Sequence, residues 1–192
     1  MRWPWLLQWR LSGRLYRLHW SLPVGALGAW LLWPSTDTVL GYLLLIAAHH
    51  AGHRLLARRG GLSTTGMDLH ALGGDAHHKG KAPRLRYVLA GAGGVLGQML
   101  LLWLTLLVVA VAGLSSDTDL YRALTTLNLG LMALNLLPVS GTDASALWAL
   151  PGALVARLEE KLTYLQIQEV EAKRASWQEM IDRDQALSLI HI

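Results

Sequence analysis

The sequence predicts an all-α polytopic membrane protein with about four transmembrane helices, and two observations lead to this fold class. Of the 192 residues, 53% are hydrophobic and only 16% are charged, with a mean hydropathy of +0.33. A soluble domain of this size needs a larger share of polar residues to cover its surface. The charged residues are also unevenly placed, because they gather between long uncharged stretches.

Four stretches contain no Asp, Glu, Lys or Arg and are long enough, or nearly so, to cross a bilayer. A helix of about 20 residues spans roughly 30 Å of hydrocarbon. The stretches are residues 18–36, 38–53, 87–116 and 123–142. The third is the clearest, since it contains the run LLLWLTLLVVAVAGL. A cleavable signal peptide is disfavoured for the first, because the run before it is long and rich in Trp and no small-residue cleavage pattern comes after it.

The connections between these stretches alternate in charge. Four arginines and no acidic residue precede the first stretch, and seven basic residues oppose two aspartates between the second and third. The positive-inside rule then places both termini and the central connection in the cytoplasm. The net charge of +4 does not indicate nucleic-acid binding, because the basic residues are divided among connections rather than gathered on one face.

The composition changes after Pro151 to the charged segment RLEEKLTYLQIQEVEAKRASWQEMIDRDQ. Leucines recur at helical spacing at positions 154, 158, 162 and 165, which predicts a soluble or interfacial helix. We therefore expect a membrane-embedded domain over residues 1–151 and a cytoplasmic amphipathic helix over 152–192. This helix could dock on the membrane domain, pair with a second copy or bind a partner, and the sequence does not choose among these.

Ionisable residues within apolar helices are costly and are therefore candidate functional residues. The first such group is HHAGH, residues 49–53, near the cytoplasmic end of the second stretch. Positions four apart share a helix face, so His49 and His53 can offer two imidazoles to one metal ion. The alternative is a pair of interfacial histidines at a helix end. Cysteine is absent, which excludes thiolate ligands, disulfides and cysteine nucleophiles.

The second group is NLLPVSGTDAS, residues 135–145, at the end of the fourth stretch. Pro138 interrupts the helix and Gly141 loosens the backbone after it, so Asp143 should lie just beyond the break, at the depth of the histidines. Asp143 could alternatively cap a helix that starts at residue 144. Two His and one Asp from different helices make a three-ligand site that leaves zinc an open fourth position, as in catalytic zinc centres.

These motifs resemble the site-2 protease family of intramembrane zinc metalloproteases, in particular its compact bacterial branch. The likeness covers roughly residues 17–149. It includes RLHWSLPVGALGAW at the first stretch, HHAGHRLLARRGG where the family has its HExxH helix, and NLLPVSGTDAS where NxxPxxxxDG is usual. Between them, LHALGGDAHHKGKAPRLRYVLAGAGGVLGQMLL occupies the place of a short membrane-associated hairpin, a Gly-Gly and an AGP-containing helix.

The resemblance implies a fold, a cofactor and a substrate class. It makes His49, His53 and Asp143 the ligands of Zn²⁺, and it places Asn135 near the strand that binds substrate. The substrate would be a transmembrane peptide, cleaved near the cytoplasmic face of a bacterial inner membrane. The bilayer and a membrane protein substrate or partner are the expected contacts, and the oligomeric state is open.

The sequence departs from the family at position 50, where His50 replaces the glutamate of HExxH. That glutamate removes a proton from the attacking water and passes it to the leaving amine. Position 50 lies about 100° from His49 around the helix and so borders the site. A neutral imidazole can accept a proton but has no negative charge to place the water. We therefore expect His50 to act in a weakened protease, or else an inactive pseudo-protease that binds or regulates a membrane partner.

A second histidine group, His70, His77 and His78, lies in the central connection near two aspartates. It is either a solvated loop or the source of a substitute base or additional ligand. The many histidines also invite comparison with membrane di-iron hydroxylases. That function is less favoured, because the histidine-rich boxes are too few and the NxxPxxxxD element would have no role.

Overall fold

A computed structural model describes residues 5–137 and 143–190, with side chains described as far as residue 183. Pro138 and Gly141, on which the predicted helix break depends, lie outside the described residues. The chain divides into two compact units, residues 1–150 and 151–192. Only the first contains the predicted site.

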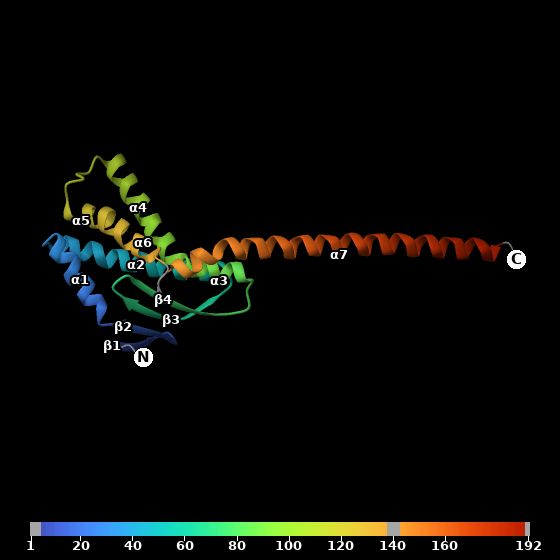
Figure 1. Cartoon of the computed structure of the whole chain (residues 1–192), viewed down its shortest axis with the longest axis horizontal. Helices are drawn as coiled ribbons and strands as arrows, with labels where there is room; N and C mark the ends of the chain where they lie inside the picture. Colours follow the sequence, from blue (N-terminus) through green and yellow to red (C-terminus); the bar gives the residue numbers. More distant parts are fainter. Residues whose placement is uncertain (1–4, 138–142, 191–192) are drawn as a thin grey trace. The chain divides into compact units, whose positions relative to one another are not determined.

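The first unit begins with two strands, β1 (Trp5–Leu11) and β2 (Arg14–His19), and two helices, α1 (Ser21–Leu32) and α2 (Thr36–Arg59). A hairpin of β3 (Ser63–His70) and β4 (Gly73–Lys79) comes next, then helices α3 (Arg84–Gly91) and α4 (Gly93–Ala112). The short helix α5 (Asp119–Arg122), the π-helical turn η1 (Ala123–Leu127) and α6 (Asn128–Asn135) run on from one to the next. Helix α7 (Ala144–Ile190) starts in the first unit and forms the second (Figure 1).

The all-α prediction is right about the helices and wrong to leave out a small sheet. Four strands pair in the order β1-β2-β3-β4, with β2 parallel to β3 and the other two pairs antiparallel. The resemblance led us to expect the β3–β4 hairpin, but β1 and β2 were not expected. Their local signal is the turn at Ser12 and Gly13, which both have positive φ as in a tight hairpin. These strands contain arginines among their apolar residues, so they do not stand out as uncharged stretches of the sequence.

Helix α2 is the central element that holds both predicted histidine ligands. Ser35 caps its start by accepting a hydrogen bond from the Thr38 N–H, and Arg58 and Arg59 lie favourably in its last turn. Its first half contributes Tyr42, Leu45 and Ile46 to a buried apolar core. Ala29 of α1 and Leu131 of α6 complete this core. The second half presents histidines instead.

Helices α2 and α4 cross at very short range through glycines. A Cβ on Gly52 of α2 would collide with the backbone oxygen of Gly93, and one on Gly97 would collide with the backbone oxygen of Ala48. Small residues allow two helix backbones to approach this closely. The start of α4 is thereby held against the turn of α2 that carries His49 and His53.

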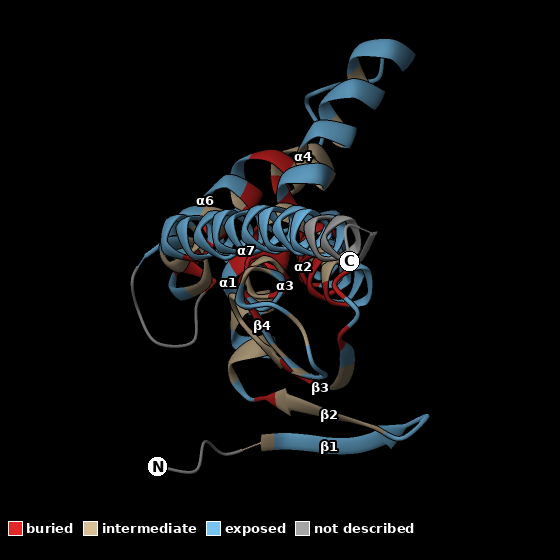
Figure 2. Ribbon diagram, turned by 90° about the vertical axis from the view of Figure 1, so that its right-hand side faces the viewer, coloured by how far each residue is buried: buried red, intermediate tan, exposed pale blue. Residues whose placement is uncertain are grey.

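Among the described residues, α4 is the one helix long and apolar enough to cross a membrane. It has 20 residues and a mean hydropathy of 2.4, and only 11% of its apolar window is buried (Figure 2). Helix α1 is apolar but shorter, with 12 residues. Helix length and composition thus indicate association with a membrane, while the count of four spans remains a prediction.

Candidate metal centre

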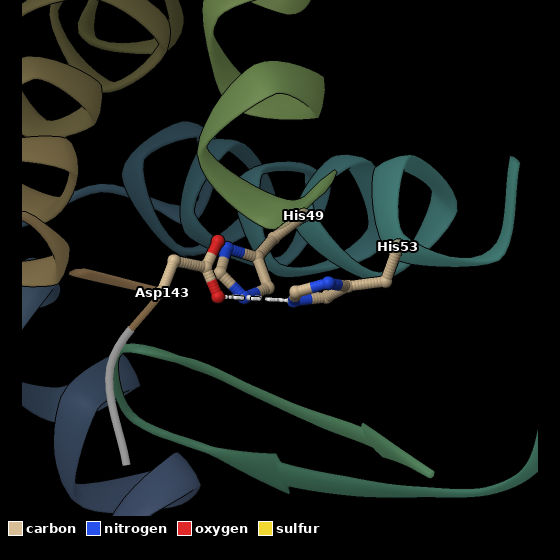
Figure 3. A group of neighbouring side chains, drawn as sticks. All are labelled: His49, His53 and Asp143. Atoms are coloured by element: carbon tan, nitrogen blue, oxygen red, sulfur yellow. Dashed lines mark hydrogen bonds and ion pairs between the residues drawn. The ribbon is translucent and has the colours of Figure 1, made fainter. Parts of the chain in front are cut away.

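The structure brings the three predicted ligands together. His49 and His53 lie one turn apart on α2, and Asp143 lies directly before α7 (Figure 3). Their exposed fractions are 1%, 3% and 6%. The Nε2 atoms of the two histidines are 3.1 Å apart, and Asp143 Oδ1 lies 3.2 Å from His53 Nε2 and 3.9 Å from His49 Nε2. One ligand atom from each residue therefore points to a common centre.

Neighbouring groups fix the orientation of each ligand. His53 Nδ1 lies 2.8 Å from the Ala90 carbonyl oxygen, and His49 Nδ1 lies 3.4 Å from Gln98 Oε1. Because the Ala90 carbonyl only accepts hydrogen bonds, His53 Nδ1 carries the proton and His53 Nε2 presents a lone pair to the centre. His49 has an acceptor near each ring nitrogen, because its Nε2 also lies 3.2 Å from the Gly74 carbonyl oxygen. Asp143 Oδ2 accepts the Val95 N–H at 2.7 Å, which leaves Oδ1 for the centre.

This donor set fits a divalent transition metal. The Nε2 atoms of the two histidines and a carboxylate oxygen lie 3.1 to 3.9 Å from one another, an arrangement that needs a proton or a cation between them. Imidazole nitrogens with one carboxylate oxygen are ligands that zinc prefers. The second interaction of each ligand, with Ala90, Gln98 or Val95, is the support that metal-binding side chains require.

Gly94 of α4 has no side chain at the point where His49 and Asp143 meet. A Cβ there would overlap the His49 imidazole and Asp143 Oδ2. We expect Gly94→Ala to lower zinc affinity by at least about tenfold, because both ligands must move from their supported positions. Competition titration against a chromogenic chelator measures the affinity. Gly130→Ala in α6 is the matched control, since a Cβ there meets nothing within 4 Å. Equal affinities in the two variants would contradict the geometry of this centre.

Gln98 is a buried polar residue beside the candidate metal centre that our sequence analysis missed. It is fully buried in α4, its Oε1 accepts the Nδ1 proton of His49, and its backbone oxygen accepts a hydrogen bond from Asn128 at 3.0 Å. A lone amide in an otherwise apolar helix was the available signal.

We expect Gln98→Leu to weaken zinc binding by about 10- to 100-fold, because His49 loses the acceptor that fixes its ring. Zinc titration measures this, and the visible spectrum of the Co²⁺-substituted protein reports any change in ligand geometry. Thr105→Val on the same helix is the control, since the Thr105 hydroxyl only bonds to the Leu101 carbonyl one turn away. Unchanged affinity and spectrum in Gln98→Leu would remove Gln98 from the site.

His50 lies beside His49, and its ring is held by a backbone group at the start of β4. Its Nε2 lies 3.0 Å from the Gly73 carbonyl oxygen, so Nε2 carries the proton. Its Nδ1 is therefore the basic atom, and this atom is buried with no hydrogen-bond partner among the described residues. The rings of His49 and His50 stand edge to face with centroids 5.8 Å apart.

Asn135 occupies the last turn of α6 and is buried. Its amide donates a 2.6 Å hydrogen bond to the Leu72 carbonyl, in the connection between β3 and β4. Asn135 thus contacts the hairpin that borders the metal centre. Its predicted role near a bound substrate strand stays a prediction.

The second histidine group, His70, His77 and His78, lies on the strands β3 and β4 and not in a loop. His70 is at the end of β3, and burial lowers its pKa below the ordinary value against the opposing effect of Asp75. His77 on β4 joins an ion-pair group with Asp68 and Arg17. Within the described part of the chain, the group able to hold a metal contains His49, His53 and Asp143, without His70, His77 or His78.

Comparison with known proteins identifies the fold. No family model matches the chain, and no curated protein matches it. Among solved structures, it is similar to a site-2 protease from Methanocaldococcus jannaschii, with 18% identity and a TM-score of 0.57. The similarity covers 79% of this chain and 72% of the other. The protein therefore has a fold like that of a site-2 protease, built around a buried His-His-Asp group that could bind a metal.

Proposed function

We propose that this protein is an intramembrane zinc metalloprotease of the site-2 protease type. The observation that supports it best is the buried convergence of His49 Nε2, His53 Nε2 and Asp143 Oδ1, each oriented by a second hydrogen bond. Such a three-ligand set leaves a position open for chemistry.

Bound zinc would polarise the scissile carbonyl and lower the pKa of an attacking water to about 7. The chain's own residues supply the remaining functions. His49, His53 and Asp143 would hold the ion at a buried position that excludes bulk water. His50 accepts the water proton at Nδ1 and returns it to the leaving amine, while its Nε2–H bond to the Gly73 carbonyl holds the ring in position.

The proposed substrate is a transmembrane peptide that unwinds near the cytoplasmic face. Asn135 would border the extended peptide, because it joins α6 to the turn of the β3–β4 hairpin beside the metal ligands. Four membrane segments are proposed, formed by α1, by α2, by α3 with α4, and by η1 with α6. The exposed apolar surface of α4 supports these segments. The basic connections favour both termini on the cytoplasmic side, and the membrane we propose is a bacterial inner membrane.

A single-turnover assay tests this function. The full chain in proteoliposomes is mixed with labelled transmembrane peptides, and cleavage is followed by mass spectrometry. We expect cleavage that stops when a chelator removes the metal and returns when Zn²⁺ is added. Metal analysis should give about one zinc per chain. A folded protein that takes up no zinc would contradict the proposal, and iron in its place would favour the di-iron oxidoreductase.

The second candidate is a pseudo-protease that retains the fold and the metal but binds or regulates a membrane partner. The replacement of the proton-accepting glutamate by His50 favours it, because imidazole brings no negative charge to the attacking water. Retained zinc without cleavage of any peptide would support this candidate over the protease.

A further inference from the structure

The N-terminal hairpin of β1 and β2 has two chemically different faces. Residues paired across antiparallel strands lie on the same face, and the register pairs Leu7 with Leu18 and Trp9 with Tyr16. The Trp9 and Tyr16 rings stack with centroids 5.7 Å apart. The face that we call the apolar face consists of Leu7, Trp9, Leu11, Tyr16 and Leu18, with Arg14 at its turn end. The opposite face, which we call the polar face, consists of Gln8, Arg10, Leu15 and Arg17, with Trp5 and His19 at the end near α1. The Arg17 guanidinium lies over the Trp5 ring there, 4.4 Å from its centroid.

The register of β2 with β3 shows which way each face points. Leu18 of the apolar face pairs with Leu69, and Leu69 packs against the core formed by α1, α2 and α6. The apolar face therefore lies on the helix side of the sheet. Arg17 of the polar face pairs with Asp68, and their side chains form an ion pair on the other side, with Arg17 Nε 2.6 Å from Asp68 Oδ1.

On the helix side of the sheet, β3 is covered by the helical core, whereas the side chains of β1 are exposed. Leu7, Trp9 and Leu11 are 57%, 37% and 61% exposed. In water, an edge strand with an exposed apolar face invites pairing and aggregation. Contact with lipid would stabilise the same face, because it removes apolar surface from water.

The open face is continuous with the surface of α1. Strand β2 ends at His19 and α1 begins at Ser21, so the hairpin lies across the lower end of this helix (Figure 1). Helix α1 contains no charged residue, and its exposed side chains are apolar, including Val24, Leu27, Leu31 and Leu32. A short helix that is apolar on all sides belongs in hydrocarbon or in a protein core. The exposure of these side chains favours hydrocarbon.

We propose that the β1–β2 hairpin is a membrane-surface anchor whose apolar face rests in the headgroup region of the bilayer, at the foot of α1. Trp9 and Tyr16 have the amphipathic rings that favour this region, and Arg14 at its turn end reaches lipid phosphates. The polar face, with the Arg17–Asp68 ion pair, faces the cytoplasm. This inference rests on the membrane placement in the proposed function, although not on proteolytic activity.

The absence of cysteine from the sequence allows a direct test with single spin labels on the full chain. Leu7→Cys and Leu11→Cys report the apolar face, and Gln8→Cys and Arg10→Cys are matched controls on exposed positions of the polar face. Leu104→Cys on exposed α4 reports membrane insertion itself. Each labelled protein is reconstituted into vesicles of equal parts phosphatidylcholine and phosphatidylglycerol. Relaxation by oxygen and by a water-soluble nickel chelate then gives the depth of each label.

We expect the labels at positions 7 and 11 to favour oxygen over nickel, and those at positions 8 and 10 to favour nickel. Equal nickel access on both faces, with position 104 in lipid, would overturn the anchor while leaving the membrane placement intact. Nickel access at position 104 as well would overturn both. Dipolar broadening between labels at position 7 would show that a second copy, and not lipid, covers the face, and would also overturn the anchor.

Discussion

Asp143→Asn is expected to remove zinc from the protein while leaving it folded. Changes in groups that only support a metal ligand cost about 10- to 100-fold in affinity, so loss of the charged ligand itself should cost more than about 100-fold. The fold should survive, because an asparagine amide can donate to His53 Nε2, which lies 3.2 Å from Asp143 Oδ1, while its oxygen accepts the Val95 N–H. Metal content after dialysis, measured by mass spectrometry, should fall from about one zinc per chain to almost none.

His78→Gln is the control for Asp143→Asn. His78 lies on β4 outside the metal group, and its Nδ1 contacts only the Thr64 hydroxyl among the hydrogen bonds of the described residues, at 3.4 Å. Its zinc content should equal that of the unmodified protein. His49→Ala provides a second removal of a ligand, and circular dichroism checks that each variant keeps its helices. Retained zinc in both Asp143→Asn and His49→Ala would overturn the metal centre.

His50→Glu is expected to raise peptide cleavage, with about 10² to 10⁴ as the ceiling, because that is the whole contribution of a positioned general base and His50 already supplies part of it. A glutamate at this position restores a negative charge beside the metal ligands, where it can place the attacking water as well as accept its proton. Single-turnover rates on the same transmembrane peptide, with zinc content matched between proteins, measure the gain.

His50→Gln separates the two proposed functions. Its amide can donate to the Gly73 carbonyl as His50 Nε2 does, but it offers no basic atom. If His50 is the base of a slow protease, the glutamine variant should lose the native activity. If the native chain and the glutamine variant are both inactive and only His50→Glu cleaves, the protein is a pseudo-protease. A fast native protein whose rate neither change alters would refute a role for position 50.

The three residues of the candidate metal centre could be predicted before any coordinates, because their signals are local. His49 and His53 are four residues apart, so an α-helix places them on one face whatever surrounds it. Asp143 comes after a proline that ends an apolar stretch, a second local signal, and its convergence with the histidines was inferred only from the combination. The structure supports that inference with ligand atoms 3.1 to 3.9 Å apart.

The hydrogen-bond partners of these ligands could not be predicted, because they come from distant positions. The acceptor for His49 is Gln98, 49 residues away, and the acceptor for His53 is a backbone carbonyl at Ala90. Backbone groups have no sequence signature. The tautomer of His50 depends in the same way on the Gly73 carbonyl, at the start of a different strand.

The sequence alone determined that apolar helices hold two imidazoles one turn apart, because composition and helical period act over short range. Tertiary structure decided which ring nitrogen of His50 and of His53 is free, which glycines let α4 approach α2, and where β1 and β2 pair. These depend on contacts between residues far apart in the chain, whose energies are set by packing and by matching of donors with acceptors. The local sequence pattern does not specify the packing between distant residues or their hydrogen-bond partners.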